Sequence, residues 1–529
     1  MIPEWFVLLP LLFPLMGGVV FALITVRFPK TRVGLAMLFL ALELAAILVN
    51  IAPGIHRLTI SSWETAAFTL GLRIDGVTLI LLAAMIVPLF SFWLVAPPRN
   101  PFDLFLMAIL TAAIFVAIAA TPLTICIACA LLDLALFLWR TARAVERETA
   151  LRGFVIGQLG GLILLAGIVM LDAGRTEAPM LMAIAFWLRL GIFPFHYLLP
   201  ARSNEANDLW FARGLPIIAA ANLWLHWSTL KIDPPITVIG ILASLAFVVT
   251  AIWIWREEKP ARAVNIASAI ALAPIPLTIA LGSGAGLAMA FWQTLAAGMA
   301  LALFEMAQRW RVDNMRQWQG LLWFLGVLSF AGIPLTPAFL GRVGLFVVLL
   351  ASGNGILLLL IGAASLMVLA ALWNIGSTLK GAESRQPRGS EYLALGILGI
   401  ALLALGFLPT IITPALGAAA SESTERVYDL VIRTTDALGV GLGVVTLALP
   451  IVGAYLLQIP LRQLRVSANS GIVRVARFID LDWLERWLVG FGYRVGVFAR
   501  NASTIAEANP TVWLLLVALW IAIFIVIAR

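Results

Sequence analysis

The chain has 529 residues, of which 62% are hydrophobic and 12% are charged, and its mean hydropathy is +1.03. Soluble domains carry about a quarter charged residues, so this composition excludes an ordinary soluble protein. The formal net charge of +8 does not indicate nucleic-acid binding, because the basic residues fall in short loops between apolar runs and report membrane topology. Apolar runs of about 20 residues recur along the whole length, which predicts an all-α polytopic protein in the lipid bilayer.

The apolar runs predict about sixteen candidate spans, beginning with 3–27 and ending with 510–528. Loops after odd-numbered spans carry clusters of positive charge, such as Arg140, Arg143 and Arg147, whereas loops after even-numbered spans carry few. This asymmetry predicts that odd-numbered spans exit into the cytoplasm. Both termini are therefore expected on the outer side of a bacterial or archaeal-type cytoplasmic membrane.

The seventh span contains a proline beside a charged residue, in WLRLGIFPFHYLLP (187–200). A proline frees backbone carbonyls and weakens a helix, and a charge within a membrane span is costly and usually functional. We expect this helix to break at Phe193–Pro194, with Arg189 pointing into the protein. His196 follows Arg189 by two helical turns, so both can face one interior path. His196 can relay protons or donate a structural hydrogen bond to the freed backbone.

The twelfth span repeats this pattern in AGIPLTPAF (331–339), where Pro334 and Pro337 precede Arg342. We expect a second break near these prolines, with Arg342 also pointing inward. Two broken helices five spans apart are typical of inverted repeats in ion-moving proteins. The fourth to eighth and ninth to thirteenth spans are therefore interpreted as two inverted five-helix repeats.

The tail has a different pattern from the spans. Residues 461–509 interleave charges with Trp, Phe and Val, which predicts an amphipathic lateral helix on the membrane surface or against a partner, followed by a last anchor at 510–527. The predicted parts are the N-terminal helices 1–3 (1–100), a first repeat (101–232), a second repeat (233–376), helices 14 and 15 (377–460), and the lateral helix with the last anchor (461–529).

Several segments, in the same order, resemble the antiporter-like membrane subunits shared by respiratory complex I, membrane-bound hydrogenases and Mrp-type sodium/proton antiporters. They are RIDGVTLILLAAMI (73–86), ETALRGFVIGQLGGLILLAG (148–167), RLGIFPFHYLLP (189–200), FAGIPLTPAFLGRVGLF (330–346) and, in the tail, FIDLDWLERW (478–487). The resemblance implies about 14 core helices. It also implies other integral membrane subunits as partners, and protons or sodium ions as cargo.

In that family, a seventh-helix lysine paired with a fifth-helix glutamate drives proton transfer toward a charged twelfth-helix residue. Arg189 and Arg342 stand at the two lysine-type positions, and Asp133 in ALLDLALFLW is the best match to the glutamate. The basic eighth-helix residues have no match, since Leu215 and either Ala221 or Asn222 stand near their positions. Arginine stays protonated up to about pH 12, so these arginines can hold a field or pair with a carboxylate but cannot release protons.

Two acidic residues within spans have alternative interpretations. Asp133 forms an ion pair with Arg189 or Arg152, or else lies at a helix end facing water. Glu43, isolated in LALELAAIL, indicates a contact with a partner subunit or a half-channel, or else a solvent-filled crevice.

Other small motifs are interpreted as packing. Gly157 and Gly161 form a G-x-x-x-G that predicts close helix packing, and Cys126 and Cys129 read as small packing residues. No metal-ligand spacing, phosphate-binding glycine loop or nucleophile elbow occurs in the sequence, so we expect neither a metal nor a redox cofactor.

Two classes of function follow. The first is a proton or sodium/proton translocating subunit, a non-redox membrane subunit of an ion-translocating oxidoreductase assembly of complex I-like, hydrogenase-like or Mrp-like type. The second is a degenerate, non-conducting scaffold subunit of such a complex. A coupling subunit for inorganic-carbon uptake is a further alternative, because it draws on the same family.

Overall fold

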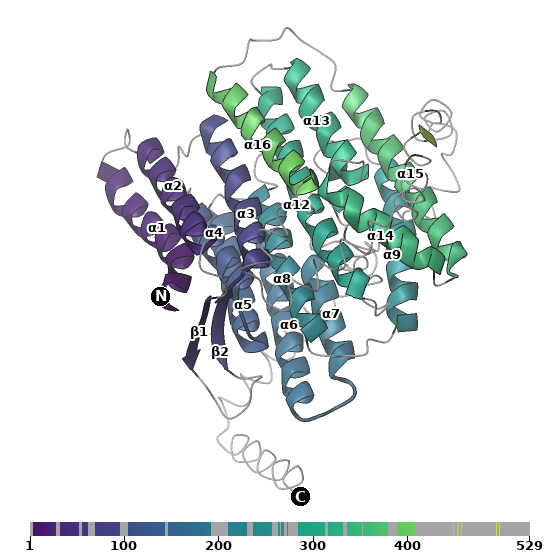
Figure 1. The fold of residues 1–529 in the computed structure, drawn as a ribbon, viewed down its shortest axis with the longest axis horizontal. Helices are drawn as coiled ribbons and strands as arrows, with labels where there is room; N and C mark the ends of the chain where they lie inside the picture. The colour runs from purple at the N-terminus through teal and green to yellow at the C-terminus, as the bar shows by residue number, and fades with distance from the viewer. Residues whose placement is uncertain are drawn as a thin grey trace, which may run out of the picture. The chain divides into compact units, whose positions relative to one another are not determined.

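The computed structural model is built almost entirely of helices (Figure 1). It describes residues 4–27, 32–51, 56–61, 69–95, 104–142, 147–191, 210–229, 236–256, 263–264, 266–268, 272, 284–312, 316–331, 336–351, 353–378 and 389–407, and the isolated positions 448, 452–453, 456, 494 and 497.

The elements before residue 192 are a 3-10 helix, two strands and seven helices: η1 (Glu4–Leu8), α1 (Leu9–Arg27), α2 (Arg32–Ile51), β1 (His56–Ser61), β2 (Leu70–Ile74), α3 (Gly76–Val95), α4 (Leu104–Ile118), α5 (Pro122–Ala142), α6 (Arg147–Asp172) and α7 (Ala178–Leu190). The later elements are a π-helical turn and seven helices: η7 (Trp210–Gly214), α8 (Leu215–Thr229), α9 (Ile236–Arg256), α12 (Gly284–Val312), α13 (Arg316–Ala331), α14 (Pro337–Ala351), α15 (Gly355–Thr378) and α16 (Gly389–Phe407).

Six of the described helices contain a stretch long and apolar enough to cross a membrane. These stretches are Gly76–Val95, Pro122–Ala142, Gly153–Asp172, Ala290–Ala307, Gly355–Trp373 and Gly389–Gly406. The chain is therefore a helical multi-pass membrane protein, as its composition predicts. The number of spans, the two repeats and the domain boundaries stay predictions.

The core is centred on α12, which packs against α8, α13 and α14 (Figure 1). Its stretch Ala290–Ala307 is wholly buried, whereas only 22% of Gly389–Gly406 in α16 is buried. A helix that is apolar on all sides and covered on all sides belongs to the interior of a bundle. Beside this core, α5 and α6 pack together and α6 packs against α7, which brings the middle of α5 and α6 and the C-terminal end of α7 to the first charged site.

A short β-hairpin adds to the predicted all-α architecture. Strands β1 and β2 pair antiparallel, with Leu58 opposite Leu72, and the register shifts between Thr59 and Ser61. Strand β2 leads directly into α3, in the RIDGVT segment that carries part of the family resemblance.

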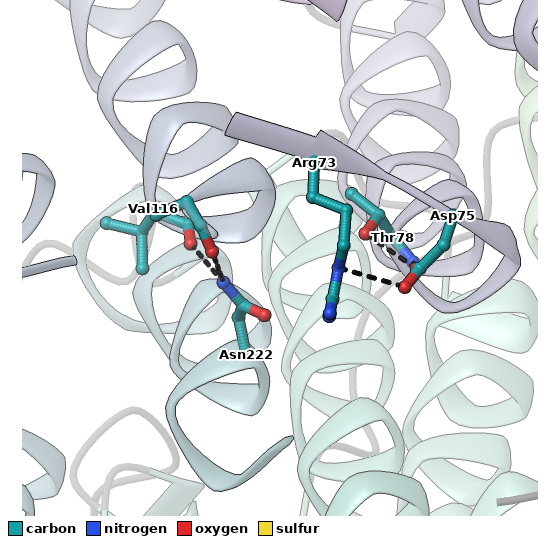
Figure 2. Close-up of polar contacts among 6 residues, drawn as sticks. Arg73, Asp75, Thr78, Val116 and Asn222 are labelled. Carbon is teal, nitrogen blue, oxygen red and sulfur yellow. Dashed lines mark hydrogen bonds and ion pairs between the residues drawn. The ribbon is translucent and has the colours of Figure 1, made fainter. Parts of the chain in front are cut away.

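Asp75 caps the N-terminus of α3, as Figure 2 shows. Its Oδ1 accepts hydrogen bonds of 2.9 Å from both the backbone N–H and the hydroxyl of Thr78, and its Oδ2 lies 3.1 Å from Nε of Arg73. An N-cap carboxylate satisfies an orphan N–H of the first turn and interacts favourably with the helix dipole. The hydrogen bonds between Asp75 and Thr78 therefore favour the start of α3 at this point.

Asn222 satisfies backbone carbonyls at the C-terminal end of a different helix, α4 (Figure 2). From α8, its side-chain amide donates to the carbonyl oxygens of Val116 at 2.8 Å and Ala119 at 3.0 Å, at the C-terminal end of α4. The last carbonyls of a helix lack intrahelical partners, so this amide satisfies two of them inside the protein. The contact ties α8 to α4.

The seventh helix ends before the predicted break. Helix α7 ends at Leu190, and Gly191 adopts a left-handed conformation with φ of 59°, which its missing side chain permits. The predicted break at Phe193–Pro194 and the side chain of His196 lie outside the described residues.

The twelfth predicted span is occupied by two helices. Helix α13 ends at Ala331 and α14 begins at Pro337, a position that suits proline because the first helical N–H needs no partner. Pro334 lies outside the described residues.

The chain divides into two units, Met1–Arg465 and Val466–Arg529. All of the helices and strands described above belong to the first unit. The predicted lateral helix at 461–509 lies outside the described residues except for positions 494 and 497, and the last anchor lies outside them entirely.

Candidate functional site

A buried ion pair joins α5 to α7. The Nη2 atom of Arg189, in the last turn of α7, lies 3.1 Å from Oδ2 of Asp133 in the middle of α5. The side chain of Arg189 is 7% exposed and that of Asp133 is 14% exposed. Of the two partners considered for Asp133, Arg189 contacts it, and the side chain of Arg152 lies outside the described residues. Each charge is held inside the protein by the other.

Glycines of α6 provide the space for this pair. A Cβ atom on Gly157 would lie 2.6 Å from the carboxyl carbon of Asp133, and a Cβ on Gly161 would lie 3.2 Å from Nη2 of Arg189. The carbonyl of Gly157 also accepts a hydrogen bond of 3.3 Å from the same nitrogen. The G-x-x-x-G, predicted to serve close helix packing, therefore also admits two charged side chains against the backbone of α6.

The pair lines a cavity of about 130 Å³ between α5, α6, α7 and the η7–α8 segment. Its charged lining residues are Asp133 and three arginines, Arg140, Arg189 and Arg213, and the remaining lining is largely apolar. A cavity volume of about 10–15 Å³ on this measure holds one water, so the cavity has room for several waters. Asp133 is the only acidic residue among the described residues that line it.

Like Arg140, which was predicted in a loop but lies in the last turn of α5 and lines the cavity, Arg213 was missed as a residue of this site. It lies in η7 immediately before α8, and 5% of it is exposed. Its Nε and Nη2 atoms have no hydrogen-bond partner within the described part of the chain. The signal was present in WFARGLP, a basic residue entering an apolar run just before Pro216, and a π-turn within a helix frequently marks a functional position.

The π-turn is held by a second acidic residue. The backbone N–H of Trp210, the first residue of η7, donates a hydrogen bond to the carboxylate of Glu305, which lies fully buried on the central helix α12. A carboxylate at this point satisfies an N–H that the start of the helical segment leaves open. The position of Arg213 is thereby linked to the core helix.

A second, smaller site surrounds Arg342 on α14. Its Nη1 donates to the hydroxyl of Ser365 on α15 at 3.3 Å, beside a cavity of about 20 Å³ that Gln293 and Ser329 also line. The side-chain amide of Gln293 donates to the carbonyl of Gly341 at 3.3 Å. The described residues around this cavity include no acidic side chain, and its volume suits a single water.

Glu43 lies apart from both cavities. It is 1% exposed on α2, which packs against α1 and α3, and neither carboxylate oxygen has a hydrogen-bond partner among the described residues. A buried acid without a partner is costly, so Glu43 stays a candidate for a contact with a partner subunit or for a half-channel. Within the same described residues, no group of three or more His, Cys, Asp or Glu side chains could hold a metal ion.

Comparison with known proteins shows which fold this is. Neither a family model nor a curated protein matches the sequence. Among solved structures, a chain of respiratory complex I from Thermus thermophilus superposes with a TM-score of 0.65 at 16% identity, covering 80% of this chain and 99% of that one. A chain of the Mrp complex from Dietzia sp. DQ12-45-1b gives 0.69 at 17% identity, covering 93% of this chain and 60% of that one.

A third match comes from an archaeal respiratory membrane complex, the membrane-bound sulfane sulfur reductase. The TM-score is 0.64 at 18% identity, and the match covers 79% of this chain and 78% of the other. This chain therefore has the fold found in subunits of these three membrane complexes. The resemblance to antiporter-like subunits that the sequence motifs indicate is confirmed at the level of the fold.

Proposed function

We propose that this chain, which has the fold of antiporter-like subunits, is a proton or sodium/proton translocating subunit of a multi-subunit membrane assembly. The observation that carries the proposal is the buried Asp133–Arg189 pair, which lies at 3.1 Å beside a cavity with room for several waters. Charges placed inside membrane spans are rare and mark ion pathways by default.

In this proposal, Asp133 is the group that gains and loses a proton. Arginine keeps its proton at accessible pH, so Arg189, Arg140 and Arg213 supply fixed positive charge around it. Protonation of Asp133 would cancel its attraction for Arg189 and release the guanidinium, and loss of that proton would close the pair again. Such opening and closing is a two-state element that a driving partner subunit can bias.

The same chemistry supports the alternative, a scaffold that has lost conduction. The basic residues in the described lining of the larger cavity are all arginines, and Arg342 contacts a hydroxyl group. A chain of proton carriers needs groups that titrate, and Asp133 is the only carboxylate among the described lining residues. The alternative predicts that substitutions at Asp133 change assembly and leave ion movement unaffected.

Location and partners belong to the same proposal. The distribution of basic loops supports a bacterial or archaeal-type cytoplasmic membrane with both termini outside. Other integral membrane subunits would supply the driving reaction and contact the tail at 461–509, whose sequence is amphipathic. No redox cofactor is assigned to this chain.

The experiment is to purify the chain with its bound neighbours, identify these by mass spectrometry, and reconstitute the complex into vesicles. A pH-sensitive dye and a sodium-sensitive dye inside the vesicles then report which ion moves when the partner reaction is driven. We expect uptake of one of the two ions. A driven, intact complex that moves neither ion would overturn the proposal in favour of the scaffold.

A further inference from the structure

Among its described lining residues, the larger cavity carries more positive than negative charge. Three arginines and one aspartate are the charged groups of its described lining, so two positive charges are in excess. Asp133 is already bonded to Arg189. The remaining positive charge is carried by Arg140, which Asp133 also attracts, and by Arg213, and the like charges of these two arginines repel one another.

Arg213 has donors that nothing in the described chain accepts. It is 5% exposed, and its Nε and Nη2 atoms have no partner there although guanidinium donors are almost always bonded when buried. Arg213 and Arg140 line the same cavity, and the guanidinium of Arg140 approaches the site from the far end of α5. Space, unsatisfied donors and uncompensated charge therefore coincide in one place.

We propose that this cavity binds a small monovalent inorganic anion between Arg213 and Arg140. A guanidinium presents paired N–H donors in one plane, which suits a halide or a planar oxyanion such as nitrate. A volume of about 130 Å³ admits an anion of that size, while the largely apolar described lining offers few hydrogen-bond partners for the hydroxyl groups of a sugar acid such as gluconate. The bound anion offsets the excess positive charge, whose repulsion is strong in a low-dielectric interior.

The site does not depend on the proposed ion translocation. It rests on the donors of Arg213 and the charge of the cavity, which are present in a scaffold as well. Its test is therefore a binding measurement in the absence of any driving reaction, so its failure is distinguishable from failure of the proposed function.

The experiment is equilibrium binding of radioactive chloride to the full-length, detergent-solubilised protein with its co-purified subunits. Salts of different anions compete at constant sodium concentration and ionic strength. We expect saturable binding of about one chloride per chain, because one cavity offers one such site. Nitrate should displace the chloride, and gluconate should not. Absence of saturable binding, or equal displacement by gluconate, would overturn the proposal.

Two variants and a matched control place the anion in the cavity. Arg213→Gln removes the unpartnered charge and should weaken chloride binding by about tenfold or more. Arg175→Gln removes an arginine from the exposed turn between α6 and α7 and should leave binding unchanged. Wild-type binding by the Arg213→Gln variant would place the anion elsewhere and contradict the assignment.

Asp133→Asn gives an independent result if the Arg213→Gln variant does not fold. Removing this carboxylate adds a further uncompensated positive charge from Arg189, so chloride affinity should rise severalfold. An affinity that is unchanged or lower in a folded Asp133→Asn protein would contradict a site whose strength depends on the net charge of this cavity.

Discussion

The two inward-facing arginines, Arg189 and Arg342, occupy similar sequence contexts and very different environments. Arg189 bonds a carboxylate at 3.1 Å beside a cavity of about 130 Å³. Arg342 donates to a serine hydroxyl at 3.3 Å beside a cavity of about 20 Å³. The same residue type after an apolar run therefore serves a charge pair in one region and a neutral hydrogen bond in the other.

This difference indicates which of the two sites can respond to protonation. A charge pair changes its energy strongly when one partner is neutralised, whereas a hydrogen bond between arginine and serine does not. The site around Asp133 can therefore act as a switch, and the site around Arg342 supplies a fixed charge. We therefore expect substitutions around Asp133 to destabilise the protein more than substitutions around Arg342.

The largest effect is expected from Asp133→Ala. It leaves the buried guanidinium of Arg189 without its partner, which costs about 3–5 kcal/mol. Chemical denaturation in detergent, followed by tryptophan fluorescence, measures the change. The single variant Arg189→Lys, which leaves Asp133 in place, should keep most of the stability in the same assay, because lysine keeps the charge. A loss below 1 kcal/mol for Asp133→Ala, read against about 3–5 expected, would mean that the pair is not buried as described.

A second effect concerns the glycine beside the pair. Gly157→Ala places a Cβ 2.6 Å from the carboxyl carbon of Asp133, so the helices must shift, at a cost of about 1–3 kcal/mol. Gly362→Ala on α15 is the matched control, since no atom lies within 4 Å of its added Cβ. The control should be neutral or slightly stabilising. Equal thermal stability of the two variants would argue against close contact between α5 and α6.

A third effect tests the frame of the first site. Asn222→Ala removes two hydrogen bonds, of 2.8 and 3.0 Å, to the end of α4, which should cost about 1–2 kcal/mol. Hydrogen exchange of the amides at the C-terminal end of α4 should accelerate more than exchange in α13. Uniform acceleration in both helices would show that the contact is not local.

The smallest effect is expected at the second site. Ser365→Ala removes the hydroxyl that Arg342 contacts, and a neutral hydrogen bond contributes about 0.5–1.5 kcal/mol. The same denaturation assay compares it with Asp133→Ala. A loss as large as that of Asp133→Ala would end the distinction between a switching and a fixed site.

The sequence predicted the charged centre better than its surroundings. Asp133 and Arg189 stand out because each interrupts an apolar run, and a charge in such a run needs a reason. Their pairing depends on how α5 and α7 meet, so the sequence alone left Arg152 as an equal candidate. Arg213 was not predicted as a site residue because it lies in η7, just before the apolar run of α8. Its place in the cavity depends on how η7 packs in the fold.

The hairpin was missed for a related reason. HRLTIS and LGLRI are short and lie between apolar spans, so strand periodicity extends over too few residues to be read. Glu305 was also unremarkable in sequence, near the charged end of a long helix, and its contact with the π-turn requires segments 95 residues apart. Local patterns indicate which residues are unusual, while their partners come from packing.

Ion uptake by vesicles that contain the driven complex with Asp133→Asn tests most directly whether Asp133 gains and loses the transported proton. Asparagine keeps the size and a hydrogen bond to Arg189 but cannot exchange a proton. Ser365→Ala at the second site is the comparison in the same vesicles. If Asp133 carries the proton, ion uptake is abolished in the assembled Asp133→Asn complex and retained with Ser365→Ala. Normal uptake by an assembled Asp133→Asn complex would contradict it.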